Sequence, residues 1–162
     1  MKFLSGKEEN NAEIYFDEAI KEALKSTCLK SKCGSVIVKD EQIIGKGLNS
    51  PPKNLDSQRK CLQNKRDFDE KVTDKTCCVH AEQRAIFKVL KNNLDEIKNS
   101  TIYFIRLDKK GNKIFAEKPY CTICSKMSLD VGIKEFVLWH KKGICVYNTE
   151  EYNILSFNYK KH

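Results

Sequence analysis

The segment TCCVHAEQRAI, residues 76–86, contains the pattern that decides how the fold and function of the whole chain are predicted. His80 and Glu82 stand two residues apart where a helical pattern begins. Further along, Cys121 and Cys124 stand three apart at the start of another helical pattern. One histidine and two cysteines supply three zinc ligands, one short of a closed tetrahedral shell. The fourth position would be open to water, as in catalytic rather than structural zinc sites.

The order H-x-E followed by P-C-x-x-C is the signature of zinc nucleobase deaminases. On these residues the chain resembles the cytidine and deoxycytidylate deaminase family. The likeness extends to GSVIVKD at residues 34–40 and GLNSP at residues 47–51, which are similar to the family's strand pair and the Gly-x-Asn after it. The resemblance implies a three-layer α/β/α fold with a mixed central sheet, a catalytic Zn²⁺ ion, and an oligomer in many members.

Two features depart from the family's usual pattern. Tyr120 separates Pro119 from Cys121, whereas the family usually has proline directly before the first cysteine. An extra turn and strand at residues 109–118 replaces a connection that is usually a few residues long. Neither feature touches a predicted metal ligand, but both reshape the expected pocket and leave the identity of the substrate open.

Hydrolytic deamination needs hydroxide at neutral pH, and zinc supplies it by lowering the pKa of its bound water to about 7. Cys121 and Cys124 lie at the first turn of a predicted helix, where the helix dipole favours thiolate over thiol. Glu82 is predicted to take a proton from the water, pass it to a ring nitrogen and help ammonia leave. The alternatives are that Glu82 occupies an ordinary helix N-terminus, and that the cysteines form a closed zinc knuckle or stay buried thiols.

Hydrophobic periodicity predicts the elements that carry these residues. The predicted elements are, in chain order, a helix capped at Asn10 or Asn11 and reaching Thr27, a hairpin of residues 35–39 and 42–47, a polar loop over 51–77, a helix from about 80 to 90, a strand over 100–107, a short strand over 113–116, a helix from 121 or 122 to about 131, a strand over 135–139 and an apolar tail over 145–157.

Helices and strands alternate in this order, which indicates the α/β class with a mixed, layered sheet. A chain of 162 residues is long enough for one domain with its own core. We expect a single zinc-dependent deaminase domain over residues 1–162, with a core at about 12–140 and the C-terminal tail packed on it. A loop as long as 51–77 in such a domain is either functional or held in place.

Cysteines outside the first set suggest how that loop is held. Cys28, after the first helix, and Cys61, in the loop, occupy places that resemble the second zinc site of deoxycytidylate deaminases. Cys77 or Cys78 would add a third ligand. A Zn²⁺ ion there would be structural, and separate reduced, partly buried thiols are the alternative.

Four residues are candidates for substrate contact: Asn49, Ala81, Arg84 and Tyr120. Asn49 matches the family's asparagine that contacts the nucleoside, although turn propensity before a proline pair would also place an asparagine there. Arg84 could meet a phosphate as a fork of donors or pair with an acidic neighbour. Tyr120 is a candidate stacking surface beside the metal.

Composition limits the partners. The net charge is +8, but lysines are spread along the chain and interleaved with acids, so a nucleic acid is possible and not favoured. Residues 1–9 lack the apolar core of a signal peptide and no long apolar run occurs, which predicts a cytoplasmic protein without membrane contact. The expected partners are a small-molecule nucleotide and, from the resemblance, further copies of the chain.

The predicted function is hydrolysis of a cyclic amidine C–N bond, namely zinc-dependent deamination of dCMP to dUMP with release of ammonia. A tRNA adenosine deaminase, or another nucleoside or base deaminase, is the alternative within the same chemistry. The usual Glu-Pro-Cys-x-x-Cys and a clear basic stripe for RNA are absent from the sequence. A non-catalytic, zinc-stabilised binding module is the alternative of another class, and it would have no use for Glu82.

Overall fold

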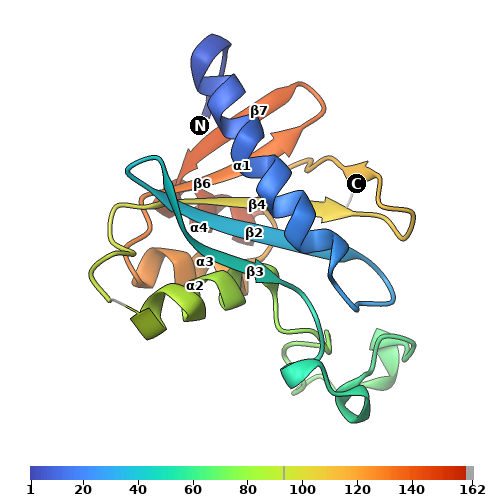
Figure 1. Cartoon of the computed structure of the whole chain (residues 1–162). Helices are drawn as coiled ribbons and strands as arrows, with labels where there is room; N and C mark the ends of the chain where they lie inside the picture. The colour runs from blue at the N-terminus through green and yellow to red at the C-terminus, as the bar shows by residue number, and fades with distance from the viewer. Residues whose placement is uncertain (93, 160–162) are drawn as a thin grey trace.

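The computed structural model describes residues 1–92 and 94–159, which are arranged around one β-sheet (Figure 1). The helices and strands follow in the order β1 (Lys2–Phe3), α1 (Gly6–Leu24), β2 (Lys32–Lys39), β3 (Gln42–Leu48), α2 (Ala81–Asn92), β4 (Thr101–Leu107), β5 (Lys113–Ile114), α3 (Thr122–Asp130), β6 (Glu135–His140), β7 (Gly143–Asn148) and α4 (Thr149–Phe157). The loop between β3 and α2 contains short 3₁₀ turns at Pro52–Asn54, Asp56–Gln58 and Lys65–Asp67.

The sheet is mixed, as the sequence predicts. Its strand order is β1-β7-β6-β4-β2-β3, with β4 and β6 parallel and each other neighbouring pair antiparallel within the described residues. The short strand β5 pairs with β4 at Arg106 and Leu107, beyond the point where β6 stops pairing with β4 at Phe104. The extra segment at residues 109–118 therefore extends the sheet next to the end of β4.

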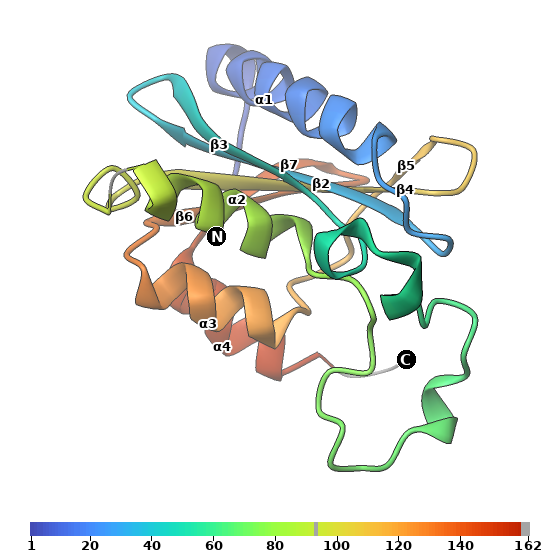
Figure 2. The ribbon, with the colours of Figure 1, turned by 60° about the horizontal axis from the view of Figure 1, so that its bottom comes forward.

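Alternation along β4 divides the core between the two faces of the sheet. Ile102 and Phe104 belong to a cluster shared with α2 and α4, whereas Tyr103, Ile105 and Leu107 pack against α1. Figure 2 shows α1 on one face and α2, α3 and α4 on the other. The predicted three-layer α/β/α fold is confirmed.

The first helix begins earlier than the sequence predicts. Its N-cap is Ser5 and its first residue is Gly6, so the prediction of a cap at Asn10 or Asn11 is wrong. Glu8 and Glu9 occupy the first turn, where their negative charge is favourable next to the helix N-terminus. This electrostatic preference, together with burial of the following turns, stabilises the additional N-terminal turn of α1. The apolar pattern alone does not predict that turn.

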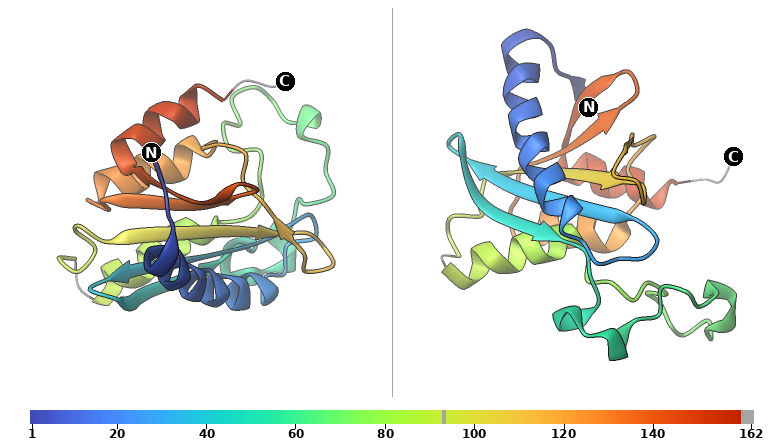
Figure 3. Two further views of the ribbon diagram at one scale, coloured as in Figure 1. Left: turned by 90° about the horizontal axis from the view of Figure 1, so that it is seen from above. Right: turned by 45° about the vertical axis from the view of Figure 1, so that its right-hand side comes forward.

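The C-terminal residues form part of the sheet and its helical cover. Strand β7 lies between β1 and β6, and α4 follows it at the C-terminal end of the chain (Figure 3, left). Tyr152 of α4 packs against Phe136 with ring centroids 3.9 Å apart. His140, the last residue of β6, is buried, and its ring nitrogen meets the Tyr147 hydroxyl at 2.8 Å. β7 covers it, and the strand pattern of residues 135–139 does not contain that information.

None of the described helices combines the length and the apolar character needed to cross a bilayer.

Glycines on the strands let the helices approach the sheet closely. A Cβ atom at Gly47 would overlap the carbonyl oxygen of Ala81 and lie 2.5 Å from the backbone nitrogen of Ala85, both in α2. A Cβ atom at Gly45 would lie 2.5 Å from a methyl group of Val89. The first turns of α2 therefore sit directly on β3, which fixes the position of the segment that carries His80.

We predict that Gly47→Ala destabilises the protein by about 2 to 3 kcal/mol or more, because the new methyl group meets helix backbone rather than a mobile side chain. Urea unfolding followed by circular dichroism measures the change. Gln42→Ala, at the exposed start of the same strand, is the control and should change stability by less than about 0.5 kcal/mol. Equal stability of the two variants would show that α2 does not require this close approach.

Candidate active site

A cavity of about 280 Å³ lies where the first turns of α2 and α3 meet the ends of the central strands. Cys33, Asn49, Phe104 and Arg106 contribute from the ends of the strands or just beyond them, and Tyr120 and Cys121 from the approach to α3. The loop between β3 and α2 projects from this end of the sheet and supplies another wall (Figure 2).

The structure brings together the three predicted metal ligands at this cavity, which His80 and Cys121 line and beneath which Cys124 is buried. The ligand atoms of His80, Cys121 and Cys124 lie within 4.8 Å of one another. The His80 Nδ1 atom is 3.2 Å from the Cys124 Sγ atom and 3.3 Å from the Cys121 Sγ atom. Tetrahedral zinc with ordinary bond lengths needs N···S separations of roughly 3.6 Å, so a shift of a few tenths of an ångström accommodates the ion.

Helix-capping interactions position these ligands. The backbone N–H of His80 donates to the Gln83 side chain at 2.9 Å, and the His80 carbonyl accepts from Arg84 N at 3.1 Å. His80 is thus the N-cap residue of α2, and the Gln83 side chain accepts from its backbone N–H as in a capping box. Cys121 is the N-cap of α3, and its sulfur accepts from Cys124 N at 3.5 Å.

The charges in the cluster suit a cation. A hydrogen bond from the Cys124 thiol lowers the pKa of Cys121 to about 4, so this sulfur is a thiolate at neutral pH. The bond to Cys121 in turn raises the pKa of His80 to about 9, so the ring is protonated at neutral pH and a metal ion would replace its Nδ1 proton. A thiolate, a second thiol and an imidazole nitrogen that converge on one point are the donor set that zinc prefers.

Glu82 lies in the first turn of α2 and is only 3% exposed. Burial, followed by the negative charge of Cys121, raises the pKa of its carboxyl group to about 7. A carboxyl group in this range can both accept and donate a proton near neutral pH.

Asp74 and Thr76 support the far side of the His80 ring, and the sequence analysis did not identify them. The Thr76 hydroxyl is 3.3 Å from His80 Nε2 and 2.6 Å from an Asp74 carboxylate oxygen. The other Asp74 oxygen is 4.0 Å from His80 Nε2. Because the Thr76 hydrogen points to Asp74, its oxygen is left to accept the Nε2–H, which frees Nδ1 for a metal.

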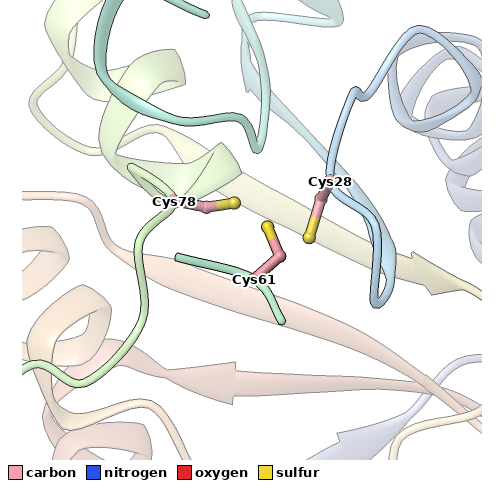
Figure 4. A group of neighbouring side chains, drawn as sticks. All are labelled: Cys28, Cys61 and Cys78. Carbon is pink, nitrogen blue, oxygen red and sulfur yellow. The ribbon is translucent and has the colours of Figure 1, made fainter. Parts of the chain in front are cut away.

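A second group of cysteines lies beside the cavity. The sulfur atoms of Cys28, Cys61 and Cys78 lie within 4.8 Å of one another and point toward one another (Figure 4). The Cys77 sulfur is 3.2 Å from that of Cys61 and 4.0 Å from that of Cys78. A hydrogen bond from Cys78 lowers the pKa of Cys28 to about 5. The structure thus brings together the cysteines that were candidates for a second Zn²⁺ site, with Cys78 inside the group and Cys77 at its edge.

Three of the predicted substrate contacts line the cavity: Asn49, Ala81 and Tyr120. The Asn49 oxygen already accepts from Cys33 N and the Ser26 hydroxyl, both at 2.7 Å, and its nitrogen donates to a backbone carbonyl. Its amide therefore shapes the end of β3 and has one N–H hydrogen left for a ligand.

Arg84, the fourth predicted substrate contact, lies outside the cavity lining. Its guanidinium donates to the carbonyl oxygens of Ser50 and Pro51 at 3.2 and 3.0 Å, and it is not among the described residues that line the cavity. Two positions after Glu82 on an α-helix, a side chain points to the opposite face. Arg84 therefore anchors the start of the long loop, and the prediction that it contacts substrate is corrected.

The chain matches a family model described as the cytidine and deoxycytidylate deaminase zinc-binding region over residues 9–140. The chain belongs to the cytidine and deoxycytidylate deaminase family. The matched region contains both halves of the His80–Cys121–Cys124 cluster. The zinc-binding family and the convergence of one histidine with two cysteines both indicate that the cofactor is Zn²⁺.

Individual relatives are distant. A deoxycytidylate deaminase of Saccharomyces cerevisiae is 26% identical over 119 residues, which cover 71% of this chain and 33% of the yeast protein. A deoxycytidylate deaminase of Mycobacterium phage D29 is 26% identical over 131 residues, covering 77% and 91%. The chain therefore spans about a third of the yeast relative. A solved dCMP deaminase of the cyanophage S-TIM5 in apo form superposes with a TM-score of 0.56 at 25% identity, covering 81% of this chain and 82% of that one.

We predict that Thr76→Val accelerates loss of zinc by about tenfold or more, because the His80 ring loses the acceptor that fixes its orientation. Transfer of zinc to a chelating dye measures the rate. Thr76→Ser keeps the hydroxyl and should restore slow release, and Thr73→Val in the same loop is the control. Zinc release from Thr76→Val at the wild-type rate would contradict a supporting role for Thr76.

Proposed function

We propose that residues 1–162 form one deaminase domain that hydrolyses dCMP to dUMP and ammonia. The observation that carries the proposal is the placement of buried Glu82 beside the converging His80, Cys121 and Cys124, a cluster that meets the cavity through His80 and Cys121. The relatives named as deoxycytidylate deaminases support the choice of substrate.

Within this proposal, His80, Cys121 and Cys124 hold the zinc ion, which supplies hydroxide at neutral pH when it is bound. Glu82 accepts the proton of the attacking water and delivers it to a nitrogen of the pyrimidine ring. It then carries a proton to the departing amine, so that ammonia leaves. The walls around Glu82 keep bulk water away from these transfers.

The charge of the cavity favours a nucleotide over a free base. Basic side chains line it from several sides: Lys30, Lys60, Lys65, Lys75 and Arg106. Glu82 is the one carboxylate among the described residues of the lining. Such a cavity attracts an anionic ligand, and the phosphate of dCMP supplies that charge.

We predict that Glu82→Gln is folded, retains wild-type zinc content and still binds nucleotide, but loses activity by roughly ten-thousand-fold or more. The amide keeps the size of the carboxyl group but can neither take nor give the proton. Ammonia release from dCMP, deoxycytidine, cytosine and tRNA, measured for both proteins, tests this.

Turnover of dCMP by Glu82→Gln at a rate comparable to wild type would remove Glu82 from the mechanism. Ammonia release by the wild type from none of the substrates would instead favour the zinc-stabilised binding module. Preferential release from tRNA would favour the alternative deaminase.

The proposal includes a second, structural zinc ion at Cys28, Cys61 and Cys78, with Cys77 as the candidate fourth ligand. The proximity of these sulfur atoms and the thiolate character of Cys28 support it. Such an ion would hold the start of α2 to the residues after α1 and so fix the long loop.

We predict that the wild type holds about two zinc ions per chain and that Cys61→Ser loses one of them. The loop over residues 51–77 should then be cut faster by trypsin. Cys33→Ser is the control, because burial raises the pKa of the Cys33 thiol to about 12 and the residue lies outside both clusters. A content of one zinc ion that Cys61→Ser leaves unchanged would exclude the second site. The cytoplasmic location and the homo-oligomeric state stay predictions.

A further inference from the structure

We propose that Arg106 forms the phosphate-binding subsite of the cavity and makes the protein select a nucleotide over its nucleoside. The inference deepens the proposed function and rests on it. It concerns a residue that neither the zinc signature nor the predicted substrate contacts include.

The position of Arg106 follows from the alternation of β4. Arg106 lies two residues after Phe104, so both side chains are on the face of the sheet that carries the predicted metal ligands. In the adjacent strand β2, Cys33 is its register partner and also lines the cavity. Arg106 is thus at the end of a central strand, next to the floor of the site.

A second cavity of about 220 Å³ adjoins the first and shares Phe104, Arg106 and Tyr120 with it. Its other walls include Phe115, Trp139 and two residues of opposite charge, Glu117 and Lys118. Arg106 therefore stands at the boundary between the cavities. A phosphate at this boundary would stay partly solvated while the base reaches Glu82.

Arg106 is exposed, and within residues 1–92 and 94–159 its guanidinium has no hydrogen bond or ion pair. Arg59 and Arg84 differ, because Arg59 pairs with Asp56 and Arg84 holds loop carbonyl groups. A guanidinium without an internal partner, beside a cavity with a single carboxylate among its described lining residues, is available to an anionic ligand.

The extra segment at residues 109–118 fixes the backbone of Arg106. Arg106 pairs with Ile114 of β5 on one side and with Cys33 of β2 on the other. The segment that replaces the family's short connection thus gives β4 a pairing strand, β5, at Arg106. A rigid backbone reduces the entropy that a phosphate contact would otherwise cost.

The other basic residues of the cavity are less suited to bind a phosphate specifically. Lys30, Lys60 and Lys65 are exposed and lie on connecting loops, and Lys75 already donates to the carbonyl oxygen of Phe68 at 3.1 Å. Lysine offers a flexible point charge, whereas arginine presents paired donors that match two phosphate oxygens. The lysines would attract the nucleotide, and Arg106 would recognise its phosphate.

The test measures binding and turnover of dCMP and deoxycytidine. Calorimetric titration of Glu82→Gln and of the double variant Glu82→Gln/Arg106→Gln gives affinities independently of catalysis. We expect Arg106→Gln to weaken dCMP binding by about 10- to 100-fold and to change deoxycytidine binding by less than about twofold. In the background with intact Glu82, kcat/KM for dCMP should fall by a similar factor while zinc content is unchanged.

Arg66→Gln removes the same charge from an exposed arginine of the long loop that is not among the described lining residues, and it is the matched control, with a loss for dCMP of no more than about threefold. Arg106→Lys should retain part of the preference for dCMP. If Arg106→Gln binds dCMP as tightly as its parent, or if Arg66→Gln loses the preference instead, the subsite is not at Arg106. Those results would leave deamination of dCMP by the wild type intact, whereas a wild type that neither binds nor deaminates dCMP would overturn both proposals.

Discussion

The close approach of α2 to strand β3 is the constraint on which the site depends. Gly45 and Gly47 leave room for helix backbone where any side chain would collide with it. The first turn of α2 can therefore bury Glu82 against the sheet and hold His80 within reach of the α3 N-terminus. The N···S distances are now 3.2 and 3.3 Å, and a helix displaced by the width of a methyl group would carry the imidazole beyond the roughly 3.6 Å that zinc bonding requires. Packing of a helix on a strand thus determines how the candidate metal ligands are arranged.

Electrostatics then divides the cavity into two parts. Near the sheet, a thiolate at Cys121 and the buried carboxyl group of Glu82 surround the point where a Zn²⁺ ion fits. Toward the opening, basic side chains from the loop and from β4 outnumber the acids of the described lining. The inner part suits a cation and the proton transfers of hydrolysis, and the outer part suits an anionic substrate. The long loop contributes to both parts, since Asp74 and Thr76 support His80 while Lys60 and Lys65 line the entrance.

The features that could be predicted from the sequence are those that depend on local periodicity and on the spacing of metal ligands. Short segments of sequence predicted the hairpin of β2 and β3 and the helix after His80. The zinc signature predicted that His80 meets Cys121 and Cys124. The structure contains all three features. Features set by tertiary contacts were missed. Arg84 anchors a loop because of the face of α2 on which it lies. Asp74 and Thr76 gain their role only when the loop folds back on His80, and Arg106 stands out only beside two cavities.

The central claim is that a metal held by His80, Cys121 and Cys124 is required for deamination. Adding zinc stepwise to metal-free protein, while recording ammonia release from dCMP, tests it most directly. The account predicts no measurable release before zinc is added, a rise in proportion to the ion bound at this site, and a plateau once the site is full. Release of ammonia by the metal-free protein at the rate of the zinc-loaded protein would contradict it.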